Sequence, residues 1–99
     1  MAKQPETKFK EKVKRELDKF GGKVWYFKSH EVSIRGIPDI IMCVNGKFVA
    51  WELKVPPNKV KKDSLQYYTL VKIAESNGVA SEVTPNNLKE HLERIESML

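Results

Sequence analysis

Hydrophobic residues recur with the period of a helix near both ends of the chain. Close to the N-terminus they follow one another at spacings of four, four and three residues: Phe9, Val13, Leu17 and Phe20. This spacing builds one face of an amphipathic helix, so we expect a helix over residues 6–20 that ends at Gly21-Gly22. At the other end, Thr84-Pro85 has the capping and proline pattern of a helix start. The helix predicted there carries four apolar residues: Leu88, Leu92, Ile95 and Leu99.

Between these helices the pattern changes to short apolar runs that are typical of strands. Residues 23–28 are rich in β-branched and aromatic side chains, which favour a strand. Two further runs, 38–44 and 47–54, flank Asn45-Gly46. Asn-Gly between such runs is the strongest short-range signal for a type I′ hairpin. Val55-Pro56-Pro57-Asn58 ends the second strand, because proline cannot donate a hydrogen bond to a ladder.

A polar connection, one more helix and one more strand complete the predicted elements. Residues 29–36 connect the first strand to the hairpin. Asp63 or Ser64 caps a helix that continues to Asn77-Gly78, and residues 79–83 form a short strand. The order α-β-β-β-α-β-α, without repeats or linkers, predicts a single α/β domain over all 99 residues, with a mixed sheet flanked by helices.

The predicted hairpin brings three charged residues together. Residues at equal distance from Asn45-Gly46 face each other in a two-residue hairpin, which places Asp39 opposite Glu52, with Cβ atoms about 5 Å apart. Lys54 follows on the same face of the strand. Both faces of the hairpin are otherwise apolar, so we expect it to be covered on both sides. Two opposed carboxylates in such a place oppose folding unless a cation or a shared proton compensates them, and their oxygen atoms suit Mg²⁺ or Mn²⁺.

A simpler interpretation of the same residues stays open. Gly36-Ile37-Pro38-Asp39 could be an ordinary turn, and Glu52 and Lys54 could form a solvated ion pair on an edge strand, where such pairs contribute little. A longer loop or a bulge near Gly46 would also shift the pairing and separate Asp39 from Glu52.

Charge and composition favour a partner that is rich in phosphate. The formal net charge is +5, and nine of the eighteen Lys and Arg residues lie in the first 28 positions. A second basic cluster follows the hairpin: Lys59, Lys61 and Lys62. The single cysteine, Cys43, excludes an internal disulfide and a zinc site built on cysteine pairs. No apolar run approaches the roughly 20 residues that span a bilayer, so we expect a cytoplasmic protein with no membrane partner.

Three motifs, in this order of elements, resemble a known nuclease family. They are Gly36-Ile37-Pro38-Asp39 at the first hairpin strand, Glu52-Leu53-Lys54 at the second, and Gln66 early in the next helix. An acidic residue followed by Glu-x-Lys on a hairpin resembles the PD-(D/E)xK nuclease superfamily. The full set is similar to its VRR-NUC family, the virus-type replication-repair nuclease domain, over residues 6–84. The resemblance implies a restriction-endonuclease-like core, metal-dependent endonuclease activity on DNA, often at branched structures such as Holliday junctions, and a homodimer, as in stand-alone phage and bacterial members.

The resemblance assigns the chemistry to a few side chains. Asp39 and Glu52, with the backbone carbonyl of Leu53, would hold the Mg²⁺ or Mn²⁺ ion that supports phosphodiester hydrolysis. Lys54 would orient or deprotonate the attacking water and counter the charge of the phosphate. Gln66 would complete the site, although a glutamine in a first helical turn is otherwise a solvated residue or a cap partner.

The family also places a glutamate on the first helix, and this chain offers three: Glu6, Glu11 and Glu16. Glu6 lies three residues before Phe9 and so shares the core-facing stripe, whereas Glu11 turns toward solvent. Glu16 is the second choice. We therefore expect Glu6 to join the site; its alternative role is compensation of the helix dipole.

Basic and aromatic residues around the hairpin are candidates for contacts with partners. Four basic residues would contact DNA phosphates, or else be solvated: Arg35, Lys59, Lys61 and Lys62. His30, in the polar connection, is a further candidate for a contact with DNA. We expect one set of apolar residues to form core and dimer interface rather than to stack on bases: Trp25, Tyr26, Phe27, Val79 and those of the last helix.

Two other functions fit the same residues. The chain could be a non-catalytic nucleic-acid-binding module that keeps the fold and the basic surface. It could also be a subunit of a larger repair complex, because 99 residues leave little room for a target-recognition element. The presence of all the expected acids and of Lys54 argues against a decayed site. We therefore expect a small endonuclease that selects DNA by its structure.

Overall fold

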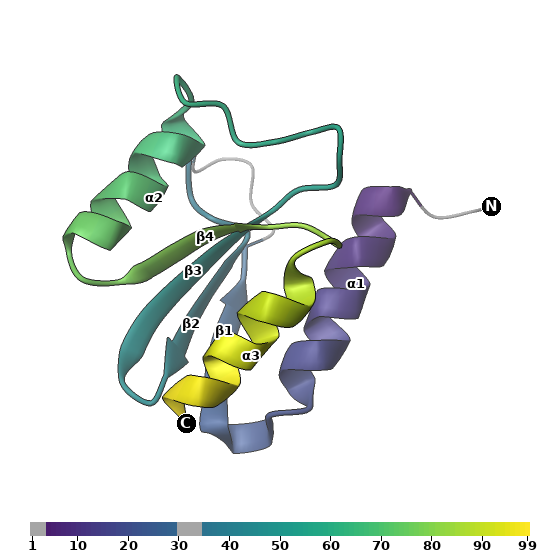
Figure 1. The fold of residues 1–99 in the computed structure, drawn as a ribbon, viewed down its shortest axis with the longest axis vertical. Coiled ribbons are helices and arrows are strands. Elements are labelled where there is room, and N and C mark those ends of the chain that lie inside the picture. Colours follow the sequence, from purple (N-terminus) through teal and green to yellow (C-terminus); the bar gives the residue numbers. More distant parts are fainter. Residues whose placement is uncertain (1–3, 30–34) are drawn as a thin grey trace.

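Helices lie on both faces of a four-stranded mixed sheet in the computed structural model, which describes residues 4–29 and 35–99 (Figure 1). The elements in chain order are α1 (Pro5–Asp18), β1 (Val24–Lys28), β2 (Ile40–Val44), β3 (Lys47–Leu53), α2 (Leu65–Glu75), β4 (Val79–Val83) and α3 (Leu88–Met98), with a single 3₁₀ turn, Gly21–Lys23, before β1. This arrangement confirms the α/β class and the mixed sheet expected from the sequence.

The hairpin of β2 and β3 occupies the middle of the sheet. The strand order is β1-β2-β3-β4, with β1–β2 and β2–β3 antiparallel and β3–β4 parallel. Ile40 pairs with Trp51 and Val44 pairs with Lys47, so Asn45-Gly46 alone joins the two strands. Asn45 and Gly46 have φ values of 51° and 82°, the positive values that a type I′ turn requires. The register predicted from the sequence is therefore confirmed.

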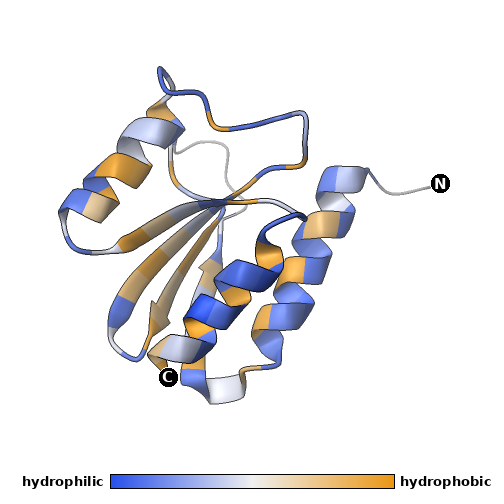
Figure 2. Cartoon of the chain, in the orientation of Figure 1, coloured by the Kyte–Doolittle hydropathy of each residue, from blue (hydrophilic) through white to orange (hydrophobic). Residues whose placement is uncertain are grey.

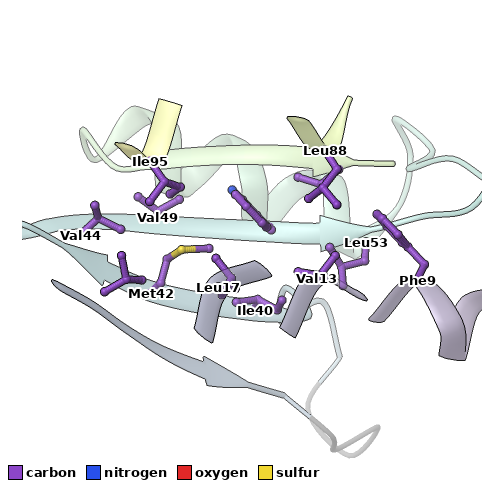
Figure 3. Packing of buried hydrophobic residues seen from close by; sticks show 13 residues of the cluster. Phe9, Val13, Leu17, Ile40, Met42, Val44, Val49, Leu53, Leu88 and Ile95 are labelled. Carbon is purple, nitrogen blue, oxygen red and sulfur yellow. The ribbon is translucent and has the colours of Figure 1, made fainter. Parts of the chain in front are cut away.

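One face of the sheet carries the hydrophobic core beneath α1 and α3 (Figure 3). Alternate strand residues that point to this face are almost fully buried: Ile40, Met42, Val44, Val49 and Trp51. The helices add the apolar stripes expected from their spacing: Phe9, Val13 and Leu17 of α1, and Leu88 and Ile95 of α3. In Figure 2 the strands are largely hydrophobic, whereas α1 and α3 carry hydrophobic residues among many hydrophilic ones.

The opposite face is only partly covered, because α2 connects β3 to β4 and packs over those two strands (Figure 1). Ala50 of β3 is fully buried there, but Cys43 is exposed, and Trp25, Phe27 and Phe48 are 63%, 55% and 45% exposed. The expectation that the hairpin is covered on both sides is therefore wrong for β2, and Trp25 and Phe27 are not core residues. An exposed apolar strand face and a buried one have the same sequence pattern, so the position of α2 decides between them.

The helices begin close to the predicted positions, with one exception. Ser64 caps α2, and its side chain accepts a hydrogen bond from the N–H of Tyr67 at 3.1 Å. α3 begins at Leu88, one turn later than Thr84-Pro85 predicts. The cause is the side chain of Asn87, whose Oδ1 accepts a hydrogen bond from the N–H of Thr84 at 2.8 Å and closes a turn before the helix. No helix in the described ranges is long and apolar enough to cross a lipid bilayer.

Candidate functional site

Asp39 lies where the hairpin ladder ends, at the opposite end from the turn. Its Oδ2 accepts a hydrogen bond from the N–H of Leu53 at 2.8 Å, and its carbonyl accepts one from the N–H of Ser29 at 2.8 Å. Pro38 precedes Asp39 and has no N–H with which to extend the ladder. The side chain of Asp39 therefore replaces backbone pairing at this point, and the hydrogen bond from Leu53 fixes the orientation of the carboxylate.

Glu52 is the one charged residue that is buried in the described part of the chain. Its side chain is 7% exposed, its Oε2 lies 3.7 Å from the Nζ of Lys54, and its Oε1 is buried without a hydrogen-bond partner. Burial and then the negative charge of Asp39 raise the pKa of Glu52 to about 7, against the opposing effects of Lys54 and of the backbone N–H of Asp39. A buried carboxylate oxygen without a donor is costly. The alternative of a solvated ion pair on an edge strand is therefore wrong: β3 is an interior strand and Glu52 is enclosed.

A small cavity of about 120 Å³ joins these carboxylates to the first helix. The charged residues that line it come from α1 and from the ends of β2 and β3: Glu6, Lys10, Asp39, Glu52 and Lys54. The N-terminal end of α1 lies beside the segment that leaves β3 (Figure 1), which accounts for this meeting of distant residues. Four of the five were predicted from the sequence, and Lys10 was not.

Lys10 escaped prediction because charge alone does not distinguish it from the other N-terminal basic residues. Its Nζ lies 4.0 Å from Oδ1 of Asp39. The signal that could have identified it is its spacing, because it lies four residues after Glu6 and three before the buried Val13. Residues three or four apart share one side of a helix, so Lys10 lies beside the core-facing stripe, on the side that reaches the cavity.

The other glutamate and the glutamine lie elsewhere. Glu16 forms an ion pair with Lys19 at 2.9 Å and lines a separate groove between α1 and α3. Gln66 is the second residue of α2, half-buried, and does not line the carboxylate cavity. The structure thus brings Glu6, but neither Glu16 nor Gln66, to the cavity of Asp39.

The basic residues proposed to contact DNA are all exposed: Arg35, Lys59, Lys61 and Lys62. Lys59 and Lys61 flank Val60, whose N–H donates a hydrogen bond to Oε1 of Glu82 at 3.2 Å. That bond anchors the segment between β3 and α2 to the sheet next to the carboxylate cavity. His30 lies outside the described residues.

The two carboxylates offer ligands of the kind that a small dication prefers. Among the residues described, no group of three or more His, Cys, Asp or Glu side chains could hold a metal ion, but Mg²⁺ is commonly bound by one or two carboxylates together with waters and substrate phosphates. The buried Oε1 of Glu52 lacks a partner that such an ion would supply. Leu53 also lines the cavity, and its carbonyl lies on the same side of β3 as the N–H that it donates to Asp39.

Comparison of the chain with known proteins leaves its family open. No family model, no curated protein and no solved structure matches it. The observations that bear on function are therefore the buried carboxylate of Glu52 near the half-buried Asp39, the unpartnered oxygen of Glu52 and the lysines that flank the two carboxylates.

Proposed function

We propose that this chain is a metal-dependent DNA endonuclease of the PD-(D/E)xK superfamily, of the VRR-NUC type, and that Asp39 and Glu52 hold its Mg²⁺ or Mn²⁺ ion. The observation that carries the proposal is Oε1 of Glu52, which is buried without a hydrogen-bond partner near a second carboxylate. Such an arrangement works against folding, and strongly perturbed carboxylates of this kind cluster at functional sites. A cation between the two carboxylates would remove this unfavourable free energy, and the relief would favour binding of the ion.

The side chains around the cavity would then have distinct roles. When bound, the dication would activate water for attack on phosphorus and offset the charge that builds on the phosphate. Asp39 is already oriented by the N–H of Leu53. Lys54 has its Nζ 3.7 Å from Oε2 of Glu52, where it would orient the attacking water as the ammonium or deprotonate it as the neutral amine. Glu6 would add a carboxylate from α1, whereas the role of Gln66 rests on the family resemblance alone.

The proposed substrate is DNA, with a preference for branched structures. The net charge of +5 favours a polyanion, and phosphate contacts position a protein on DNA without reading its sequence. Arg35 and the three lysines of the segment between β3 and α2 would make these contacts. The preference for branches comes from the family resemblance.

We place the proposed homodimer on the uncovered part of the sheet. Trp25, Phe27 and Phe48 lie in neighbouring register positions on that face, and each is about half exposed. A large aromatic side chain has about 150–250 Å² of surface, so these three present roughly 300 Å² of contiguous apolar area. An apolar groove next to Phe48, lined by Tyr68 and Ile73, extends this patch.

In a twofold-symmetric dimer, this face of one protomer would cover the same face of its partner. A stable interface buries about 800 Å² on each partner, with an apolar centre and a polar rim, and the patch is large enough to be such a centre. Apart from Leu99, which is 44% exposed, the other apolar residues expected at the interface pack against the core of the monomer: Tyr26, Val79, Leu88, Leu92 and Ile95. The dimer would double the basic surface and supply a second cutting site for branched DNA.

Cleavage of a panel of branched and linear DNAs, in Mg²⁺ and in Mn²⁺, tests the proposed activity. Asp39→Asn keeps the shape of the side chain and removes one of the two charges, so it should abolish metal-dependent cleavage while the circular dichroism spectrum stays native. Glu16→Gln, on the far part of α1, is the matched control and should cleave like the wild type. Wild-type cleavage by Asp39→Asn would refute the site.

The same panel separates the proposed nuclease from its two alternative functions. A non-catalytic binding module would bind DNA and cleave none of the substrates in either metal. A subunit of a larger complex would also bind without cleavage, and it would gain activity only with its partner. Cleavage by the purified chain would exclude both.

A further inference from the structure

Lys10 reaches the carboxylate cavity from the helix side. Its Nζ lies 4.0 Å from Oδ1 of Asp39, while the Nζ of Lys54 lies 3.7 Å from Oε2 of Glu52. Asp39 and Glu52 therefore each have their own lysine, one from α1 and one from the residue that follows β3. The proposed reaction gives Lys54 a role and leaves Lys10 without one.

The contact of Lys10 with Asp39 does not act as a structural clamp. The carboxylate is already fixed through its other oxygen by the N–H of Leu53 at 2.8 Å. The Lys10 side chain is 38% exposed, and an ion pair at 4.0 Å in such a place contributes little to stability. Lys14, one turn further along α1, forms the more usual surface pair with Asp18 on its own helix. Lys10 instead lies near a carboxylate outside its own helix, that of Asp39 before β2.

A dication at Asp39 and Glu52 would change the surroundings of Lys10. The dication would push the Lys10 ammonium away from Oδ1 of Asp39, because like charges at short range repel each other. The stem of Lys10 is long and partly in solvent, so its head can move outward while the stem stays on the helix. The negatively charged group that would arrive at the mouth of this cavity is a backbone phosphate of the substrate.

We propose that Lys10 is a phosphate-binding residue that neutralises Asp39 in the metal-free protein and contacts a DNA backbone phosphate when the site is loaded. This inference rests on the proposed nuclease function and deepens it. Lys10 and Lys54 would then hold the phosphate backbone from two sides, one from α1 and one from the end of β3. Lys10 would bind and position the DNA, while Lys54 would act on the attacking water.

Two measurements on Lys10→Met test the proposal without relying on cleavage. Isothermal titration calorimetry with Mg²⁺ alone should show tighter binding than in the wild type, because a competing cation is gone. Binding of duplex and branched DNA, measured in Ca²⁺ across a range of salt concentrations, should be weaker. The slope of log affinity against log salt should decrease in magnitude by about 0.9, the value for one lost phosphate contact.

Lys14→Met is the matched control, since it removes the same charge from the same helix one turn away. It should leave the Mg²⁺ affinity and the salt slope at the wild-type values. Lys10→Arg keeps the charge and should keep the wild-type slope of log affinity against log salt. This variant also serves as a test if Lys10→Met folds poorly. An unchanged slope in Lys10→Met, or weaker Mg²⁺ binding, would overturn the inference. If the wild type neither binds Mg²⁺ nor cleaves DNA, it is the proposed function that fails.

Discussion

Replacing Glu52 by glutamine should make the metal-free protein relatively more stable as the pH rises, while abolishing cleavage. The pKa of this buried carboxyl is raised from 4.5 to about 7, first by burial and then by Asp39. The folded protein therefore binds the proton of Glu52 more tightly than the unfolded chain does. Ionisation of Glu52 costs nothing below pH 4.5, costs progressively more between pH 4.5 and 7, and reaches its full cost above pH 7.

The size of this cost follows from the difference between the two pKa values. It corresponds to about 3 kcal/mol of unfolding free energy, since one pKa unit is worth about 1.4 kcal/mol. The glutamine of the variant has no proton to exchange, so any cost of burying its amide is the same at every pH. The free energy of unfolding of Glu52→Gln, minus that of the wild type, should therefore increase by about 3 kcal/mol from about pH 4 to about pH 8.

Urea unfolding in EDTA, followed by circular dichroism at several pH values, measures this difference. Glu16→Gln is the control, because its ion pair with Lys19 is at the surface, and its difference from the wild type should change little with pH. Mg²⁺ added at about pH 8 should stabilise the wild type and have much less effect on Glu52→Gln. A difference between variant and wild type that does not change with pH would refute the reasoning about Glu52.

Two further predictions concern turnover and assembly. Lys54→Ala should lose most of the cleavage rate while the Mg²⁺ affinity measured by calorimetry stays the same or increases, because a nearby cation is removed; loss of metal binding together with cleavage would instead indicate a structural role. Light scattering should give the wild type about twice the 11.4 kDa of one chain, and Trp25→Ser with Phe27→Ser should give a folded monomer, because both side chains are exposed. A wild-type mass of a single chain, with full activity on branched DNA at the same concentration, would rule the dimer out.

The part of the site that lies on the hairpin could be predicted because its cause is local. Asn45 and Gly46 both adopt positive φ, and a two-residue turn of this type fixes the register of the strands that it joins. The facing positions of Asp39 and Glu52 follow from that register by counting. The burial of Glu52 does not follow in this way, because Phe48 on the same face of β3 is 45% exposed.

The parts that escaped prediction depend on how distant segments pack. Whether α2 covers β2 depends on the crossover from β3 to β4, and the pattern of β2 is the same in either case. Lys10 reaches Asp39 only because the start of α1 meets the end of β3. α3 begins later than predicted because the side chain of Asn87 closes a turn before the helix. The residues around Asn87 give no sequence signal for this turn.

Two neighbouring acidic residues at the end of the sheet, Glu52 and Glu82, differ in their hydrogen bonds. Glu82 pairs with Glu52 across the parallel strands β4 and β3, so it lies next to Glu52 in the sheet. Its Oε1 accepts the N–H of Val60 and thereby holds the basic segment in place, and Glu82 does not line the carboxylate cavity. Glu52 has no such donor for its own Oε1. The contrast between these neighbours supports the view that the oxygen of Glu52 is kept for a ligand, because a backbone N–H satisfies the equivalent oxygen one strand away.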